Sequence, residues 1–269
     1  MDEHKKEEIL DKYLLFAKEI AIEAGKIMLK YFNCNNGAYY KEDKTIVTKA
    51  DNKINSYLIK RVKEVFPTHA VDGEEEKFGN SECVWVCDPI DGTCPYANNI
   101  PISVFSLALV VNGNSLIGVV YDPFMANMYS AIKGKGAFLN DKKISVNNIP
   151  LNDMRSVSNF DNWPSSPYNM YPVVSELGKK TYFLSLGSVI RACMCVATGK
   201  FNLAIFPGTK NKNCDIAAVK VIVEEAGGRV SNLYGEEQKY NTDIKGAIVS
   251  NKLVHNEVVE VVNKIIKNR

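Results

Sequence analysis

The stretch that decides the fold and chemistry of this chain is Trp85-Val86-Cys87-Asp88-Pro89-Ile90-Asp91-Gly92-Thr93. Val84 to Val86 predict a short buried strand, and Pro89 is expected to end it because proline has no N–H for a central strand. The carboxylates of Asp88 and Asp91 then follow the strand in a loop, where functional residues concentrate. The alternative interpretation of the Asp-Pro and Asp-Gly pairs is an Asx turn after a core strand.

The same stretch offers oxygen ligands for a hard divalent cation. Proteins bind Mg²⁺ through carboxylates, carbonyls and retained waters in octahedral arrangement. Asp88, Asp91 and the carbonyl of Ile90 supply three such ligands. Gly92 lets the backbone approach a ligand, and a helix starting at Thr93 would direct free N–H groups toward an anion. The stretch therefore predicts a divalent metal held against a phosphate.

Carboxylates in two further segments have the character of additional ligands. Asp72-Gly73-Glu74-Glu75-Glu76 lies upstream, and Cys214-Asp215 precedes an apolar, helix-like run that ends at Gly227-Gly228. Taken alone, the first segment would be a solvated acidic turn, and Asp215 would be a helix N-cap. The three segments together predict one shared cation cluster.

With these segments in this order, the chain resembles the inositol monophosphatase family. That family lies within the superfamily of metal-dependent, lithium-sensitive phosphatases that also contains fructose-1,6-bisphosphatase. The Asp-Pro-Ile-Asp-Gly-Thr element at 88–93, with Gly73-Glu74-Glu75 upstream, is specific to the family. Supporting matches extend over almost the whole chain: Thr48-Lys49-Ala50-Asp51, Lys133 to Asn140, Gly187-Ser188, Val196 to Gly199 and Asp215 to Gly228.

The resemblance implies Mg²⁺ as the cofactor, with two or three ions in each active site. Glu74, Asp88 and the Ile90 carbonyl would hold one ion. Asp88, Asp91 and Asp215 would hold a second, and Glu74 would serve a third, weaker site. These five residues are the implied metal ligands.

The resemblance also implies direct attack of an activated water on the phosphoryl group, without a phosphoenzyme. Thr93, Asp51 and Glu74 would orient and deprotonate that water. The residues implied to bind phosphate and substrate are Asp91, Gly92, Thr93, Gly187, Ser188 and Asp215.

The departures from the family pattern concern the wall that would contact the alcohol part of the substrate. Phe206 and a longer loop, Pro207 to Asn213, stand where animal inositol monophosphatases carry a glutamate that binds an inositol hydroxyl. Further departures are Cys214 for a tryptophan, Cys94-Pro95-Tyr96 for Thr-Asn-Phe, and Asn202 for a frequent aspartate. These departures weaken the case for inositol as the alcohol.

Cations lie near the same wall. Arg191, and Lys210 with Lys212, are candidates for binding a second anionic group, as on a bisphosphate. The alternative interpretation is ordinary surface charge, since isolated Lys and Arg residues are mostly exposed.

Periodicity predicts a mixed α/β (α+β) fold. Apolar residues at helical spacing predict a long helix over residues 5–32 and a second from about Asp51 to Phe66. Between residues 103 and 139, four short β-rich runs separated by turns predict an antiparallel meander with a hairpin at Asn112-Gly113-Asn114. Polar residues Asn159 to Pro172 predict a connector, after which helices and strands alternate. The later elements are expected at 182–186, 189–198, 202–206, after Asp215, 228–231, 247–250 and from His255.

The chain is expected to consist of two joined halves. Residues 1–150 form an N-terminal α+β half with most metal ligands, and residues 151–269 form a C-terminal α/β half with Asp215 and the substrate wall. The resemblance implies a layered αβαβα sandwich with an antiparallel N-terminal sheet and a mixed C-terminal sheet. We expect the active site between the halves, where ligand sites are common.

Composition excludes several other classes of protein. A chain of 269 residues with 46% hydrophobic content can bury a large core, and a net charge of +2 without long like-charge blocks argues against a nucleic-acid partner. The charged N-terminus and short apolar runs predict a soluble cytoplasmic protein with no membrane partner. Seven cysteines suit a reducing compartment. Their pairs, Cys83 with Cys87 and Cys193 with Cys195, lack the spacing of a tetrahedral zinc site.

Three functional hypotheses remain open. The first is a Mg²⁺-dependent phosphatase of inositol monophosphate or a related small polyol or sugar phosphate. The second has the same chemistry on histidinol phosphate, fructose-1,6-bisphosphate or an adenosine bisphosphate. The third is a catalytically silent homologue that binds phosphorylated metabolites, although such a protein should have lost a ligand or the threonine. The resemblance also suggests a lithium-sensitive homodimer.

Overall fold

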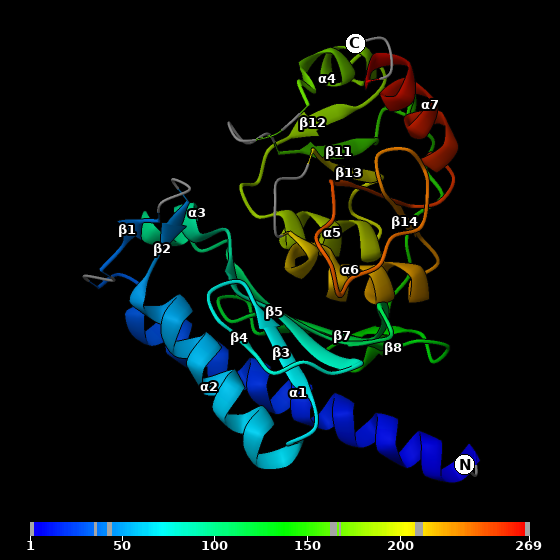
Figure 1. The fold of residues 1–269 in the computed structure, drawn as a ribbon. Helices are drawn as coiled ribbons and strands as arrows, with labels where there is room; N and C mark the ends of the chain where they lie inside the picture. The colour runs from blue at the N-terminus through cyan, green and yellow to red at the C-terminus, as the bar shows by residue number, and fades with distance from the viewer. Residues whose placement is uncertain are drawn as a thin grey trace.

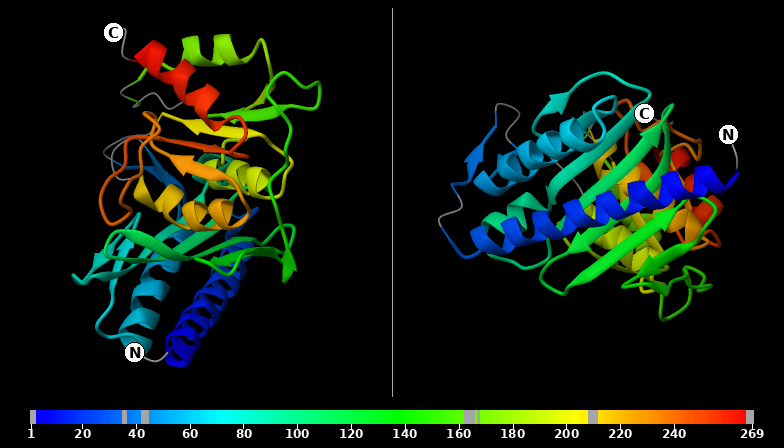
Figure 2. Two further views of the ribbon diagram at one scale, coloured as in Figure 1. Left: turned by 90° about the vertical axis from the view of Figure 1, so that its right-hand side faces the viewer. Right: turned by 90° about the horizontal axis from the view of Figure 1, so that it is seen from below.

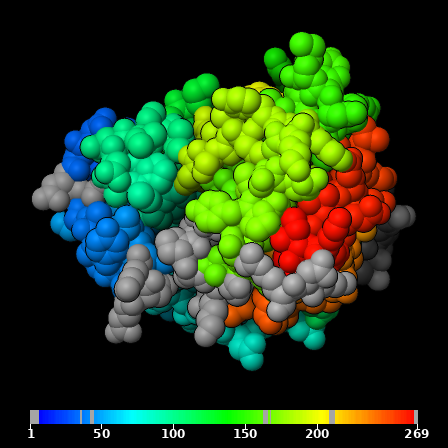
Figure 3. Space-filling view, turned by 90° about the horizontal axis from the view of Figure 1, so that it is seen from above, coloured from blue at the N-terminus to red at the C-terminus, as the bar shows by residue number. Residues whose placement is uncertain are grey.

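The computed structural model describes residues 3–34, 37–41, 45–161, 166, 168–207 and 212–266. These residues stack in five layers, alternating helices and sheets, which confirms the layered αβαβα fold (Figures 1 and 2). The first layer holds α1 (Glu3–Tyr31) and α2 (Lys49–Val65), and the middle layer holds α5 (Val189–Ala197) and α6 (Asn213–Glu225). The last layer holds α4 (Tyr171–Leu177) and α7 (His255–Ile266), which lie side by side when the molecule is viewed from above (Figure 3).

The two long N-terminal helices follow the predicted apolar periodicity. Helix α1 buries Phe16, Ile20 and Ala24 on one face, as expected from helical spacing. Helix α2 begins with a capping box, in which the Thr48 side chain accepts from the backbone and Asp51 bonds back to the Thr48 N–H. None of the described helices is both long enough and apolar enough to span a lipid bilayer.

The N-terminal sheet has eight strands in the order β10-β9-β8-β7-β6-β5-β3-β4. Its strands are β3 (Ala70–Gly73), β4 (Lys77–Phe78), β5 (Cys83–Asp91), β6 (Val104–Val111), β7 (Asn114–Asp122), β8 (Asn127–Ile132), β9 (Ala137–Leu139) and β10 (Lys142–Lys143). The predicted meander and the hairpin between β6 and β7 are confirmed. The sheet is antiparallel except where strand β3, which the sequence did not predict, pairs with β5 in parallel. A separate two-stranded sheet joins β1 (Tyr39–Tyr40) and β2 (Ile46–Val47).

Strand β5 runs further than the sequence predicted. Pro89 does not end it; the strand continues to Asp91. Its register with β6 shifts between Asp88 and Asp91, so one extra residue is accommodated on β5. Such a bulge tolerates proline because the bulged residues leave the regular ladder of hydrogen bonds, and bulges often redirect side chains next to active sites.

The C-terminal sheet is mixed, as predicted, with the order β12-β11-β13-β15-β14. Its strands are β11 (Val157–Phe160), β12 (Tyr182–Leu184), β13 (Leu203–Phe206), β14 (Arg229–Ser231) and β15 (Ala247–Ser250). Part of the predicted polar connector was wrong, because its first residues belong to β11 and its last to α4. Residues 162–165 and 167 of that connector lie outside the described residues.

The middle helices bury apolar residues against both sheets. One hydrophobic cluster contains Val110 and Val120 of the first sheet, Ile216 and Ile222 of α6, and Val249 of the second sheet. The two sheets use residues 70–143 and 157–250, which supports a division near residue 150. That division remains a prediction.

Gly118 on β7 sets how closely α6 approaches the first sheet. A Cβ at this position would lie 2.6 Å from the carbonyl oxygen of Ala218 in α6. We expect Gly118→Ala to lower the free energy of unfolding by about 1–3 kcal/mol, because the helix backbone must shift to relieve the clash. Urea denaturation measures this change. Ser115→Ala on the same strand is the control, since its buried hydroxyl has no hydrogen-bond partner; equal stability of the two variants would contradict the prediction.

Candidate active site

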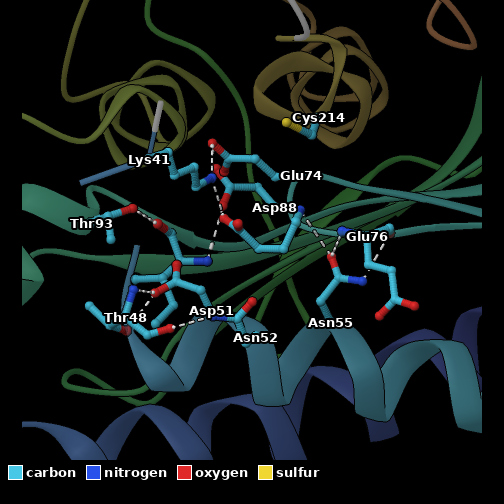
Figure 4. A network of polar contacts seen from close by, with 12 residues as sticks. Lys41, Thr48, Asp51, Asn52, Asn55, Glu74, Glu76, Asp88, Thr93 and Cys214 are labelled. Atoms are coloured by element: carbon cyan, nitrogen blue, oxygen red, sulfur yellow. Dashed lines mark hydrogen bonds and ion pairs between the residues drawn. The ribbon is translucent and has the colours of Figure 1, made fainter. Parts of the chain in front are cut away.

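Glu74 and Asp88 are brought together by the parallel pairing of β3 with β5. Gly73 lies opposite Cys87, and the Glu74 N–H donates to the Cys87 carbonyl at 3.0 Å. From the other side, the start of α6 presents Cys214. The ligand atoms of Glu74, Asp88 and Cys214 all lie within 4.8 Å of one another (Figure 4).

Asn55 of α2 fixes the turn that presents Glu74. Its side-chain oxygen accepts from the N–H groups of Glu75 and Glu76, both at 3.3 Å, and its Nδ2 donates to the Glu76 carbonyl at 3.0 Å. The contact needs glycine at 73, where a Cβ would lie 2.1 Å from the Asn55 oxygen. Sequence reasoning missed Asn55; the available signal was its position four residues after Asp51, on the same helix face.

Asp91 is held by the beginning of α5, in the other half of the chain. The Ser188 hydroxyl and the Ile190 N–H, the latter at 2.9 Å, both donate to Asp91 Oδ2. Ser188 is also the N-cap of α5, where its hydroxyl accepts from the Arg191 N–H at 3.3 Å. Ser188 of the predicted pair Gly187-Ser188 therefore contacts Asp91, a proposed metal ligand.

Asp215 lies in the first turn of α6. The helix begins at Asn213, with Lys212 as the preceding cap residue, so Asp215 is not an N-cap. A carboxylate is favoured there because the helix N-terminus carries positive charge. The Cys214 thiol lies 3.5 Å from Asp215 Oδ1. Asp215 is 3% exposed, so it needs a cation or a proton to stabilise it.

Gly92 and Thr93 form the predicted turn into a helix. Gly92, with φ of +81°, caps α3 (Thr93–Ala97), and a Cβ on it would lie 3.1 Å from the Gly187 carbonyl oxygen. The Thr93 hydroxyl donates to the Ile90 carbonyl at 3.0 Å. The turn therefore presents the Ile90 carbonyl and the Thr93 hydroxyl together, and Figure 4 shows Thr93 near Asp51.

Asp51 lies below the cluster, on α2. Its Oδ2 accepts from the Thr48 N–H at 2.8 Å and from the Thr48 hydroxyl at 2.5 Å. Its Oδ1 is buried without a hydrogen-bond partner. The role expected for Asp51, with Thr93 and Glu74, in orienting one water remains a prediction. The free Oδ1 is an acceptor that a water or cation would satisfy.

Two lysines place ammonium groups at the carboxylates. Lys212 Nζ lies 2.9 Å from Glu74 Oε1 and 3.9 Å from Asp215 Oδ1. Lys41, which sequence reasoning missed, lies 3.9 Å from Glu74 Oε1 and 2.7 Å from Glu75 Oε1. Both lysines are largely buried, which distinguishes them from ordinary surface charge.

The other residues of the predicted substrate wall have different surroundings. Arg191 forms an ion pair with the buried Asp122, so its guanidinium is already engaged. Phe206 is buried in the core rather than presented to a ligand. Asn202 is buried and donates to the Ile149 carbonyl at 2.5 Å. Lys210 lies outside the described residues.

The crowded carboxylates raise one another's pKa values. Burial, followed by repulsion from Glu74, Asp91 and Asp215, raises the pKa of Asp88 well above its ordinary value. Burial and the neighbouring Asp215 raise the pKa of Asp91 to about 7, and burial raises the pKa of Asp215 to about 6. Burial would also raise the pKa of Glu74, but the ammonium groups of Lys212 and Lys41 lower it.

This arrangement fits a divalent cation. Ligand oxygens of Glu74 and Asp88 lie within 4.8 Å of each other, and Asp88 is also repelled by Asp91 and Asp215. Protons or positive charge relieve this repulsion. The buried Oδ1 of Asp51 accepts no hydrogen bond from the protein, so it is one more buried acceptor. Oxygen donors of this kind suit a hard ion.

The raised pKa values predict that metal-free protein loses stability as pH rises. Burial raises the pKa of Asp51 to about 7, as it does for Asp91. In the unfolded chain these groups ionise near pH 4. Between about pH 4 and 7 the folded state therefore binds more protons than the unfolded state, so the free energy of unfolding falls as pH rises and levels off above that range.

Urea denaturation in a chelator, across about pH 5 to 8, measures this dependence. The same series with saturating Mg²⁺ is the control, since the cation stabilises the ionised carboxylates and should flatten the curve. Parallel curves with and without Mg²⁺ would contradict the prediction.

Comparisons with known proteins identify the family of this chain. The family model described as "Inositol monophosphatase family" matches residues 9–267. The chain is 34% identical to a fructose-1,6-bisphosphatase/inositol-1-monophosphatase of Aquifex aeolicus, covering 97% of this chain and 98% of the relative. It is 29% identical to a histidinol-phosphatase of Chlorobaculum parvum, covering 95% and 98%.

The fold has a solved counterpart of similar length. The structure of an IMPase from Thermotoga maritima superposes with a TM-score of 0.86 at 28% identity, covering 96% of this chain and 99% of that one. Because the family model matches nearly the whole chain, this protein belongs to the inositol monophosphatase family.

Proposed function

We propose that this protein is a Mg²⁺-dependent phosphomonoesterase that hydrolyses inositol monophosphate or a related small polyol or sugar phosphate. Its family is metal-dependent, and its homologues are phosphatases. The observation that carries the proposal is that ligand oxygens of Glu74 and Asp88 lie within 4.8 Å of each other, with Asp91 and Asp215 near enough to repel Asp88. The catalytically silent hypothesis loses support because every implied ligand and Thr93 are present.

Hydrolysis of a phosphate monoester without a catalyst is among the slowest known reactions, leaving up to about 10²¹-fold for an enzyme to supply. Two or three Mg²⁺ ions would supply positive charge against the phosphate dianion and a nucleophilic water at neutral pH. The residues proposed to hold one ion are Glu74, Asp88 and the Ile90 carbonyl. Those proposed for the other are Asp88, Asp91 and Asp215.

The protein's own groups would position the reactants. The Thr93 hydroxyl and the free Oδ1 of Asp51, with Glu74, are proposed to orient the attacking water and accept its proton. The N–H groups of Gly92 and Thr93 would bind phosphate oxygens, and Ser188 would keep Asp91 in place. Because the transition state of phosphoryl transfer is loose, positioning and electrostatics supply most of the remaining catalysis.

A second candidate substrate is fructose-1,6-bisphosphate. The Aquifex aeolicus relative is named for both activities, and Lys212 places a largely buried ammonium at the site that could meet a second anionic group. Histidinol phosphate, the substrate named by the Chlorobaculum parvum relative, and an adenosine bisphosphate complete the set to be tested.

Released phosphate should be measured on all these esters, with Mg²⁺, with chelator, and with Mg²⁺ plus Li⁺. We expect turnover that requires Mg²⁺ and falls with Li⁺. The ranking of kcat/KM between inositol monophosphate and the bisphosphates decides the substrate. Absence of turnover on every ester would refute the proposed function.

We further propose a cytoplasmic homodimer that acts on a small phosphorylated metabolite, without nucleic-acid or membrane partners. Light scattering that gives the mass of one chain, 30.0 kDa, would refute the dimer.

A further inference from the structure

Cys214 lies beside the proposed metal ligands Glu74 and Asp88, but its thiol has no role in the proposed reaction. It lies in the first turn of α6 and is 3% exposed. Its sulfur lies within 4.8 Å of the ligand oxygens of both Glu74 and Asp88, as Figure 4 shows from the side of α6. In the part of the chain that the structure describes, no other three His, Cys, Asp or Glu side chains bring ligand atoms this close together.

Sulfur changes which ions this cluster can bind. Mg²⁺ takes oxygen ligands, and a thiolate adds little to its binding. Zn²⁺ binds Cys sulfur at about 2.3 Å and carboxylate oxygen at about 2.0–2.2 Å in tetrahedral geometry, so two ligand atoms of one zinc ion lie about 3.3–3.6 Å apart. The ligand atoms of these three side chains lie within 4.8 Å of one another, so they must approach by up to about 1.5 Å to share one zinc ion.

We propose that Cys214, Glu74 and Asp88 form a Zn²⁺ site that competes with Mg²⁺ in this active centre. The inference rests on the proposed function, because two of its ligands are proposed Mg²⁺ ligands. A zinc ion held by the thiolate would occupy Glu74 and Asp88 and so prevent the Mg²⁺ arrangement. Zinc at low concentration would then inhibit the enzyme.

Three charged neighbours bear on this site. Lys212 bonds to Glu74 Oε1 at 2.9 Å, so zinc must displace this ammonium from the carboxylate. Lys41 lies further from Glu74, at 3.9 Å. The Asp215 carboxylate lies 3.5 Å from the Cys214 sulfur, but it does not belong to the group whose ligand atoms lie within 4.8 Å of one another. A water would complete the tetrahedral geometry that zinc prefers.

Isothermal titration of the full chain with Zn²⁺ and, separately, with Mg²⁺ tests the proposal in wild type and Cys214→Ser. We expect the variant to bind Zn²⁺ at least about 10-fold more weakly, since disturbing even an outer-shell partner of a metal ligand costs that much. Mg²⁺ affinity should not change. Cys83→Ser is the control, because this partly buried thiol lies at the other end of β5 from Asp88.

Cadmium gives a readout that does not depend on activity. In wild type, Cd²⁺ should produce thiolate-to-metal charge-transfer absorption in the ultraviolet, and excess Mg²⁺ should raise the Cd²⁺ concentration needed to produce it. The band should be absent from Cys214→Ser and retained in Cys83→Ser. If Cys214→Ser fails to fold, the Cd²⁺ band of wild type and the competition between Cd²⁺ and Mg²⁺ still test the proposal.

The outcomes separate the two proposals. Absence of the Cd²⁺ band in wild type, or equal Zn²⁺ affinity in wild type and Cys214→Ser, means that Cys214 only packs and overturns the zinc site. Normal Mg²⁺ binding in that case leaves the proposed function intact. Failure to bind Mg²⁺ at all would refute the proposed function itself.

Discussion

Asp88→Asn is expected to lower kcat/KM by about 10²-fold or more at limiting Mg²⁺. Asp88 is 2% exposed and interacts electrostatically with Glu74, Asp91 and Asp215, so it is the carboxylate that both proposed metal sites share. An amide keeps the shape but removes the charge that attracts the cations. Phosphate release as a function of Mg²⁺ concentration, on the best substrate, measures the loss, and high Mg²⁺ should recover part of it.

The same substitution should behave differently in the metal-free protein. Because burial and like charges raise the pKa of Asp88, its ionised form destabilises the folded state, and Asn should leave the chelator-treated protein at least as stable. Glu75→Gln is the matched control: this carboxylate bonds to Lys41 beside the site but is not a proposed ligand. An Asp88→Asn enzyme with an unchanged rate at limiting Mg²⁺ would refute the metal assignment.

Thr93→Val is expected to lower kcat by about 10²-fold or more, the range found for loss of general acid–base groups. Valine keeps the shape of threonine but removes the hydroxyl, which lies 3.0 Å from the Ile90 carbonyl oxygen. The expected loss falls on kcat rather than on Mg²⁺ affinity, because the hydroxyl is not among the proposed ligands. Steady-state kinetics at saturating Mg²⁺, together with a Mg²⁺ titration, separate the two effects.

Thr93→Ser is the control for this position, since serine retains the hydroxyl and should retain most of the rate. If Thr93→Val and Thr93→Ser turn over equally fast, the hydroxyl has no part in orienting the water. The role would then pass to Asp51 and Glu74 alone.

Elements with strong local signals were predicted well from the sequence. The helices expected at 5–32 and from 51 to 66 are found at Glu3–Tyr31 and Lys49–Val65. Their apolar periodicity and the stop before Pro67 lie within each segment, so no distant contact was needed to recognise them. The meander of residues 103–139 was recognised for the same reason.

Elements whose structure depends on contacts with other segments of the chain were missed or predicted wrongly. Strands β3 and β11 are each fixed by parallel pairing with a partner distant in the sequence, which no local pattern reveals. Pro89 was expected to end a strand because proline lacks a backbone N–H, which can be recognised from the sequence alone. Whether a hydrogen bond from an N–H is needed at this position depends on the register of β5 with β6. A bulge between Asp88 and Asp91 takes Pro89 out of the regular ladder of hydrogen bonds, so no N–H is needed there.

The sequence by itself determined the kinds of ligand and their order along the chain, because the family motifs are contiguous and the chemistry of carboxylates does not depend on the fold. Only the tertiary structure decided which atoms meet. It brings Cys214 to Glu74 and Asp88, Ser188 to Asp91, and Arg191 to Asp122 rather than to a substrate anion. These contacts join residues far apart in the sequence, and they exist because α5 and α6 pack between two sheets. Hydrophobic patterning predicts that such helices are buried, but it does not specify which polar side chains their ends will meet.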